Sequence, residues 1–110
     1  MRPGDPELYE QAARELRALG FPVAKLLHRW LRDLTAGFVP VASVRVLLGA
    51  PRDPPWQRID YADGIVVIFR LLSEGELKAA GCEGPQLLIA RIVRESEVRC
   101  ATEELFRDAP

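Results

Sequence analysis

The run IVVIFRLL at residues 65–72 is the feature that most limits what this chain can fold into. More than half of the run is β-branched or aromatic, which is typical of a β-strand. Asp63-Gly64 before it is a turn signal, and Ser73 and Glu76 after it form a capping box that predicts a helix start. The run is far shorter than the ~20 apolar residues that a membrane-spanning helix needs. We therefore expect a core strand that leads directly into a short helix.

The rest of the chain predicts helices and strands that surround this strand. Asp5-Pro6-Glu7 has the pattern of a helix start, and Gly20 that of a helix end. A second amphipathic helix is expected over 22–37, strands over 41–48 and 87–93, and an acidic surface helix over 95–108. The long Pro-rich loop between the first two strands contains a possible short strand at 57–61.

This order of elements, ααβ(β)βαβα, predicts one globular domain over residues 1–110. We expect an α+β or α/β fold: a two-layer sandwich with a small mixed sheet of three to four strands and about four helices. The unit from Ile65 to Val93 favours a parallel, right-handed crossover. Its connection is only just long enough for a crossover, so an antiparallel return is the alternative.

Composition restricts the classes of function. The net charge of −1 and pI near 5.8 argue against a nucleic-acid binder, which is usually strongly basic. Two cysteines and a start without an apolar signal region predict a cytoplasmic location. The absence of Asn and the excess of Arg over Lys, thirteen to two, are expected of a GC-rich bacterium, and of a thermophile.

The alternation of side chains along the strands gathers three arginines on one face of the sheet. Sorting each strand by odd and even positions gives one wholly apolar face and a second face with Arg45, Arg70 and Arg91 among aliphatic residues. A buried face does not tolerate three guanidinium groups without acidic partners. Three covers are possible: another helix of the same chain, a second copy of the protein, or an anionic small molecule.

Other residues with chemical potential have simple structural explanations. Trp56 lies between prolines and arginines in the long loop, where it is either a binding anchor or a plug of the core. Asp60 and Asp63 resemble a weak Mg²⁺ or Ca²⁺ pattern, but a turn explains them as well. His28 is the only histidine, and Cys82 and Cys100 form no motif with it.

These observations predict a domain without catalytic activity or cofactor. We expect it to act through protein contacts, as a homodimer or an accessory subunit, with Arg45, Arg70, Arg91 and Trp56 at the contact. One alternative is a regulatory domain that binds a small anion at the three arginines. A weaker alternative is a metal-dependent hydrolase that uses Asp60, Asp63 and His28.

Overall fold

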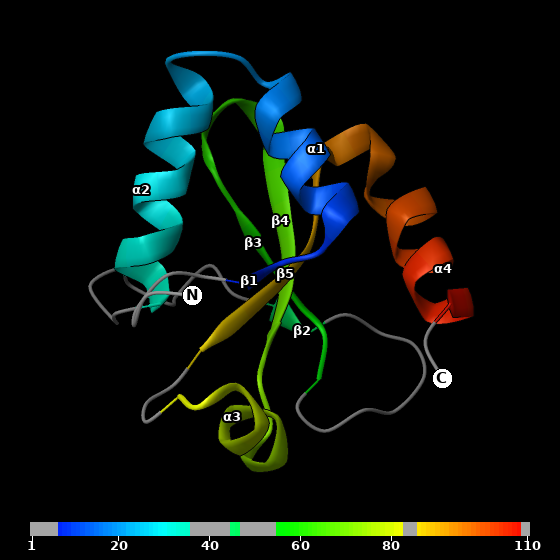
Figure 1. Ribbon diagram of the computed structural model, residues 1–110. Coiled ribbons are helices and arrows are strands. Elements are labelled where there is room, and N and C mark those ends of the chain that lie inside the picture. The colour runs from blue at the N-terminus through cyan, green and yellow to red at the C-terminus, as the bar shows by residue number, and fades with distance from the viewer. Residues whose placement is uncertain (1–6, 36–44, 47–54, 83–85, 109–110) are drawn as a thin grey trace.

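The computed structural model describes residues 7–35, 45–46, 55–82 and 86–108. They form a mixed five-stranded sheet in the order β1-β5-β4-β3-β2, with helices packed on it (Figure 1). The elements are β1 (Glu7–Leu8), α1 (Glu10–Ala18), α2 (Val23–Thr35), β2 (Arg45–Val46), β3 (Gln57–Asp60), η1 (Ala62–Gly64), β4 (Ile65–Leu71), α3 (Glu74–Ala80), β5 (Leu87–Arg94), η2 (Glu95–Glu97) and α4 (Val98–Asp108). The α+β class is confirmed, and from α1 onward the helices and strands follow the expected order. Within the described residues, no helix is both long and apolar enough to cross a membrane.

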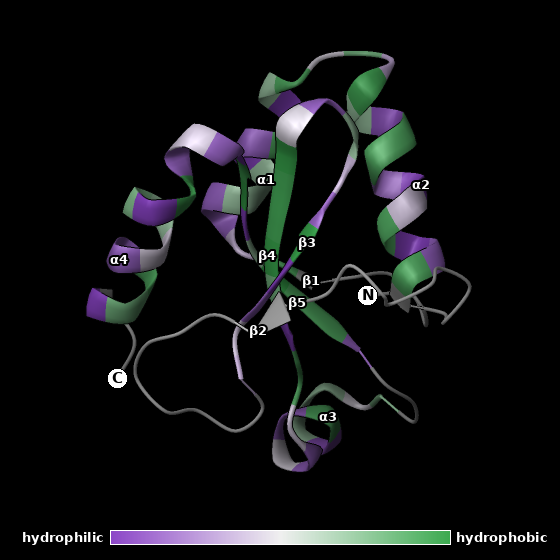
Figure 2. Cartoon of the chain, turned by 180° about the vertical axis from the view of Figure 1, so that it is seen from behind, coloured by the Kyte–Doolittle hydropathy of each residue, from purple (hydrophilic) through white to green (hydrophobic). Residues whose placement is uncertain are grey.

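The central strand β4 is what the run IVVIFRLL predicts. All of its residues except Leu71 are buried, and Figure 2 shows it as a nearly continuous hydrophobic strand. At its start Asp63 and Gly64 both have positive φ, of 61° and 73°, as the turn signal predicts. At its end Ser73 and Glu76 form the expected capping box of α3, and Gly81 closes that helix in the left-handed conformation.

Two predictions about the sheet are wrong. The helix expected to start at Asp5-Pro6-Glu7 does not include Glu7 or Leu8: these two residues are the strand β1, parallel to β5, and α1 begins only at Glu10. The strands β4 and β5 are antiparallel, so the favoured crossover from Ile65 to Val93 is wrong and the alternative, an antiparallel return, is correct. The short α3 therefore lies at the end of the β4–β5 pair rather than across the sheet (Figure 1).

Helices cover both faces of the sheet, which adds a layer to the expected sandwich. The first core packs α1 and α2 against one face and contains Ala12, Leu16, Leu27, Leu31, Leu34, Ile59, Ile65, Val67, Phe69, Leu87, Ile89 and Ile92. The second core packs α4 against the other face and contains Trp56, Val66, Ile68, Leu72, Leu88, Ala90, Val93, Val98 and Ala101. The strand β4 supplies side chains to both.

The prediction of which face each β5 side chain occupies is partly wrong, because the pairing of β5 with β4 contains a register shift. Ile68 pairs with Arg91 but Phe69 pairs with Ile89, so Ala90 is an extra residue in the ladder. The strand therefore changes phase at Ala90. Leu88 and Ala90 were expected on the same face as Ile92, yet they belong to the second core and Ile92 to the first. The sorting of β4 holds for Ile65, Val67 and Phe69 in the first core and for Val66 and Ile68 in the second, but Leu71, which was expected with the first group, is exposed.

Candidate functional site

Arg70 forms an ion pair with an acid of the same chain, Glu76. Its side chain is 3% exposed, and its Nη1 and Nη2 donate to Oε1 and Oε2 of Glu76 at 2.6 and 2.7 Å. Oε1 of Glu76 also accepts the Ser73 N–H at 3.0 Å. Arg70, and after it the Ser73 backbone, lower the pKa of Glu76 to about 2. One carboxylate therefore both caps α3 and neutralises the sheet arginine.

Arg91 lies where β5 changes phase, and it binds two acids. Its Nε and Nη2 donate to Glu15 of α1 at 3.0 to 3.2 Å, and its Nη1 donates to Glu104 of α4 at 2.9 Å. Glu15 also accepts the backbone N–H of Ile92 at 2.9 Å. Hydrogen bonding to Glu15 raises the pKa of the Arg91 guanidinium, burial opposes this, and Glu104 adds to it. Arg91 thus links the helices on the two faces of the sheet.

The other two predicted contact residues are Trp56, which is buried, and Arg45, of which only the backbone is described. Trp56 is 3% exposed and belongs to the second core, where the Arg70 guanidinium lies 5.3 Å from its ring centroid and Tyr9 packs against it edge-on. It therefore plugs the core, as the second interpretation of the sequence has it. Arg45 forms β2 with Val46 and pairs through its backbone with Arg58, but its side chain lies outside the described residues.

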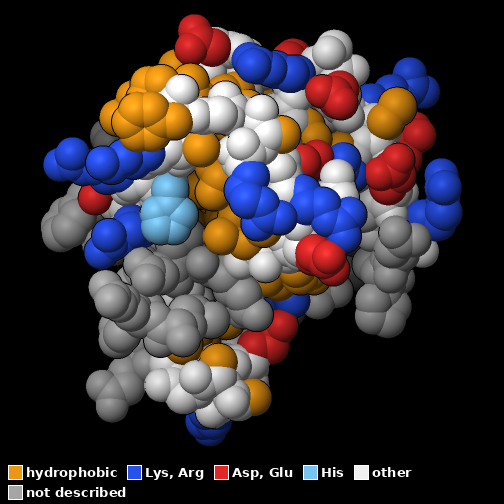
Figure 3. Space-filling model, turned by 45° about the horizontal axis from the view of Figure 1, so that its top comes forward, with side chains coloured by type: hydrophobic (Ala, Val, Ile, Leu, Met, Phe, Trp, Pro, Cys, Tyr) orange, Lys and Arg blue, Asp and Glu red, His pale blue; other side chains and the backbone are white. Residues whose placement is uncertain are grey.

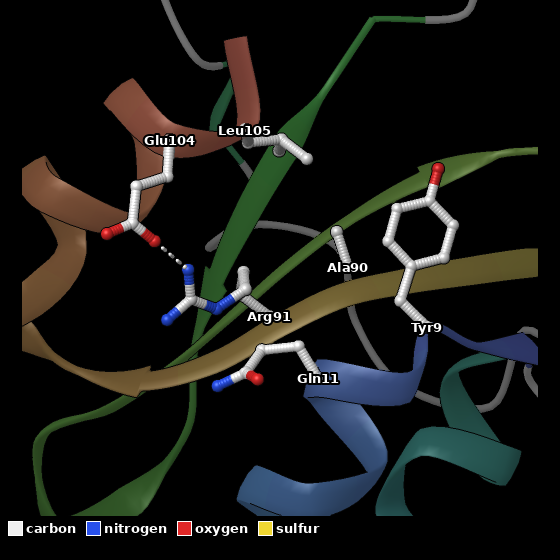
Figure 4. Close-up of a pocket in the computed structure, with 6 residues that line it drawn as sticks. All are labelled: Tyr9, Gln11, Ala90, Arg91, Glu104 and Leu105. Carbon is white, nitrogen blue, oxygen red and sulfur yellow. Dashed lines mark hydrogen bonds and ion pairs between the residues drawn. The ribbon is translucent and has the colours of Figure 1, made fainter. Parts of the chain in front are cut away.

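A cavity of about 460 Å³ opens beside Arg91 (Figure 4). It is lined by Tyr9, Gln11, Ala90, Arg91, Glu104 and Leu105. Tyr9 ends the β1 segment with its N–H bonded to the Ile89 carbonyl, and its side chain is 41% exposed. Glu104 and Leu105 come from α4 on the far side of the cavity. The end of β1, the extra residue of β5 and the last turns of α4 therefore enclose the same space.

The two acids of the turn, Asp60 and Asp63, both lie next to arginines. Asp60 accepts from Arg58 Nη2 at 2.7 Å, and Arg58 also pairs with Glu95 of η2. Asp63 is exposed in the turn, and its carbonyl accepts from Arg94 at 2.7 Å. Within the described residues, no group of three or more His, Cys, Asp or Glu side chains is placed to hold a metal ion. Cys82 and Cys100 are both free thiols.

The corner between α1 and α2 exposes large apolar side chains. Phe21 is 83% exposed in the turn, and Leu26 is 54% exposed in the first turn of α2. Lys25 and Arg29 of α2 are exposed as well. In Figure 3 hydrophobic and basic side chains gather at the end of the molecule that carries this corner. We call these four residues the α2 surface.

No known family model, curated protein or solved structure shows a significant match to this chain.

The residues that the sequence interpretation missed are the partners of the arginines. The sequence predicted that buried arginines need acidic partners, and it identified Glu76, but only as a member of the capping box. Glu15 and Glu104 had no such signal, because they lie on polar positions of helices at separations of 76 and 13 residues from Arg91. The exposed Phe21 follows a helix-ending glycine, where an apolar residue is normally expected to fold inward.

Proposed function

We propose that this protein is a non-catalytic interaction domain that self-associates through the α2 surface. The observation that carries the proposal is the 83% exposure of Phe21, together with the 54% exposure of Leu26 in the first turn of the helix that follows it. Single exposed apolar residues are ordinary, but an aromatic and a leucine that share one corner with a basic rim are typical of an interaction site. A partner that covers this corner removes both side chains from water.

Charge identifies the surface of a second copy that fits the α2 surface. Residues 17–33 carry four basic residues and one acid, a net charge of +3. Residues 95–108 carry five acids and two arginines, a net charge of −3, and Glu97 and Glu103 among them are exposed. Two α2 surfaces placed face to face bring like charges together. The contact favoured by charge is therefore α2 of one copy on η2 and α4 of the next, a head-to-tail contact.

The sheet arginines support a partner or an anion less well. An anion at Arg70 must displace Glu76, and one at Arg91 must displace Glu15 and Glu104. Displacing a carboxylate from a part-buried guanidinium leaves that carboxylate without its charge partner. This is why we place the proposed contact on the α2 surface and not on the face with Arg45, Arg70 and Arg91.

Sedimentation of the purified protein tests the proposal. We expect the weight-average mass to rise with concentration, and to rise more at low salt because the contact is electrostatic in part. Phe21→Ser should reduce this association, whereas Leu71→Ser, a change at another exposed apolar residue, should not. A monomer at all concentrations up to several hundred micromolar in low salt would overturn the proposal.

The two lysines of the chain provide a matched pair of charge variants. Lys25 belongs to the α2 surface and Lys78 lies on α3, and both are exposed. Lys25→Glu should weaken self-association and Lys78→Glu should leave it unchanged. Mixing Lys25→Glu protein with a Glu97→Lys, Glu103→Lys variant should restore a heterologous contact. Equal effects of the two lysine changes would show that net charge, and not this surface, controls association.

The setting that we propose for this domain is the cytoplasm of a GC-rich, thermophilic bacterium. Composition supports it: the chain has no Asn, and its only Met is the first residue. Heating the protein while following circular dichroism tests the thermophilic part. A midpoint near 50 °C, which is ordinary for mesophilic domains, would contradict it.

A further inference from the structure

The two acids that bind Arg91 carry more negative charge than Arg91 neutralises, and only one of them, Glu104, lines the cavity. Glu15 takes two nitrogens of the guanidinium and is itself only 15% exposed, so Arg91 and Glu15 form a nearly closed pair. Glu104 binds only Nη1 and keeps 56% of its side chain exposed. The three groups together have a net charge of −1. The surplus charge is that of Glu104, which lines the cavity.

The remaining walls of the cavity are apolar or aromatic. Ala90 forms the floor with a small side chain, Leu105 lies above it, and the ring of Tyr9 stands at the end away from Glu104 (Figure 4). Gln11 adds one amide. The volume of about 460 Å³ lies within the range of ~300–1,000 Å³ that is usual for small-ligand sites. The cavity therefore has an acidic end and an apolar, aromatic body.

We propose that this cavity binds an organic cation, a primary ammonium or guanidinium group carried on an apolar body. The cationic head pairs with the Glu104 carboxylate through a charge-assisted hydrogen bond. The apolar body lies over Ala90 and Leu105 and reaches the Tyr9 ring. A carboxylate or phosphate is disfavoured because Glu15 already occupies the guanidinium and Glu104 repels the anion. The site shares α4 with the proposed self-association contact but uses neither Phe21 nor the rest of the α2 surface, so binding is followed at low protein concentration, where that contact is not formed.

Two sources of this chemistry are tested side by side: a free amine and a lysine side chain of a peptide. The free amines are phenethylamine and agmatine, and the peptide is acetyl-Gly-Lys-Gly-amide. Matched controls are 2-phenylethanol, 3-phenylpropionate and the same peptide with norleucine in place of lysine. Each is titrated into the protein at low concentration while amide NMR shifts of Ala90, Arg91 and Leu105 are followed. Tighter binding of the amines or of the peptide identifies the source.

Variants separate this site from nonspecific attraction to an acidic helix. Glu104→Gln should weaken cation binding about tenfold, as expected for loss of one charge-assisted contact. Glu103→Gln, which removes the neighbouring exposed acid outside the cavity, should change it less than twofold. Circular dichroism confirms that both variants are folded. The proposal is overturned if no cation shifts these amides, if phenylethanol or phenylpropionate binds as tightly, or if the two variants behave alike.

Discussion

Arg70 and Arg91 come from neighbouring strands and were predicted from the same alternation, yet their surroundings differ. Arg70 lies on the central strand β4 and has one acid, Glu76, six residues away. Arg91 lies on β5 beside the short β1 and has two acids, from α1 and α4. At Arg70 one acid balances one arginine and the guanidinium is buried. At Arg91 two acids surround one arginine, and one of them, Glu104, lines a cavity. Position in the sheet, rather than residue type, thus decides whether an arginine is structural or accessible.

Glu76→Ala should have the largest effect on stability. It leaves the Arg70 guanidinium, 3% exposed, without its charge partner, and it removes the capping box of α3. We expect the free energy of unfolding to fall by about 3 kcal/mol, measured by urea denaturation. Replacing both partners, as Arg70→Met with Glu76→Gln, should recover much of the loss. A loss below about 1 kcal/mol would show that the Arg70 site behaves like an exposed ion pair.

The same interaction should make stability depend on acid. Glu76 has a pKa of about 2 in the folded protein against 4.5 for an ordinary glutamate, so its contribution is complete above pH 4.5. As the pH falls from 4.5 to about 2, the folded carboxylate takes up a proton and this contribution disappears. Urea midpoints of the natural protein should therefore fall faster over this window than those of Glu76→Gln. Glu97→Gln, on the exposed η2, should retain the natural slope.

Glu15→Ala should have an intermediate effect because it removes two interactions at once. Arg91 loses its closer acid, and the Ile92 N–H loses its acceptor. We expect a loss of about 2 kcal/mol, together with faster hydrogen exchange of the Ile92 amide. Glu10→Ala on the same helix removes the exposed pair with Arg14 and should cause no measurable change. Unaltered exchange at Ile92 would contradict the role given to Glu15.

Glu104→Gln should have the smallest effect on stability. Arg91 keeps Glu15 when Glu104 is neutralised, and an exposed ion pair contributes little in water. We expect a change below about 0.5 kcal/mol in the free energy of unfolding. A loss as large as that of Glu15→Ala would show that both acids hold Arg91 equally, and the contrast between a closed pair and a surplus acid would be wrong.

Sequence reasoning succeeds here where the determinants are local. The capping box, the turn with positive φ and the strand β4 all follow from residues within a few positions of one another. The short strand β3 could also be placed within the long loop. These features depend on backbone preference and on alternation, which a single sequence shows directly.

The remaining features depend on contacts between distant segments. Glu7 and Leu8 form a strand because they pair with Leu88 and Ile89 at the edge of the sheet, and their own sequence does not predict this. The extra residue Ala90 reverses the phase of β5 without any glycine or proline to mark it. For the candidate site, the arginines and their need for acids were predictable. The acids that bind Arg91, Glu15 and Glu104, could not be predicted because their positions depend on how α1 and α4 pack on the sheet.

The short length of β1 has a consequence for how the protein behaves at high concentration. In the described part of the chain, β1 pairs with β5 only at Leu88 and Ile89, so toward Arg94 β5 has a strand partner, β4, on one side only. An unpaired strand edge can form backbone hydrogen bonds with a strand of another molecule, which is a route to aggregation. Glu15 occupies the Ile92 N–H that an incoming strand needs, and it places a charge in its path. The acid that neutralises Arg91 therefore also protects the molecule against polymerisation by strand addition.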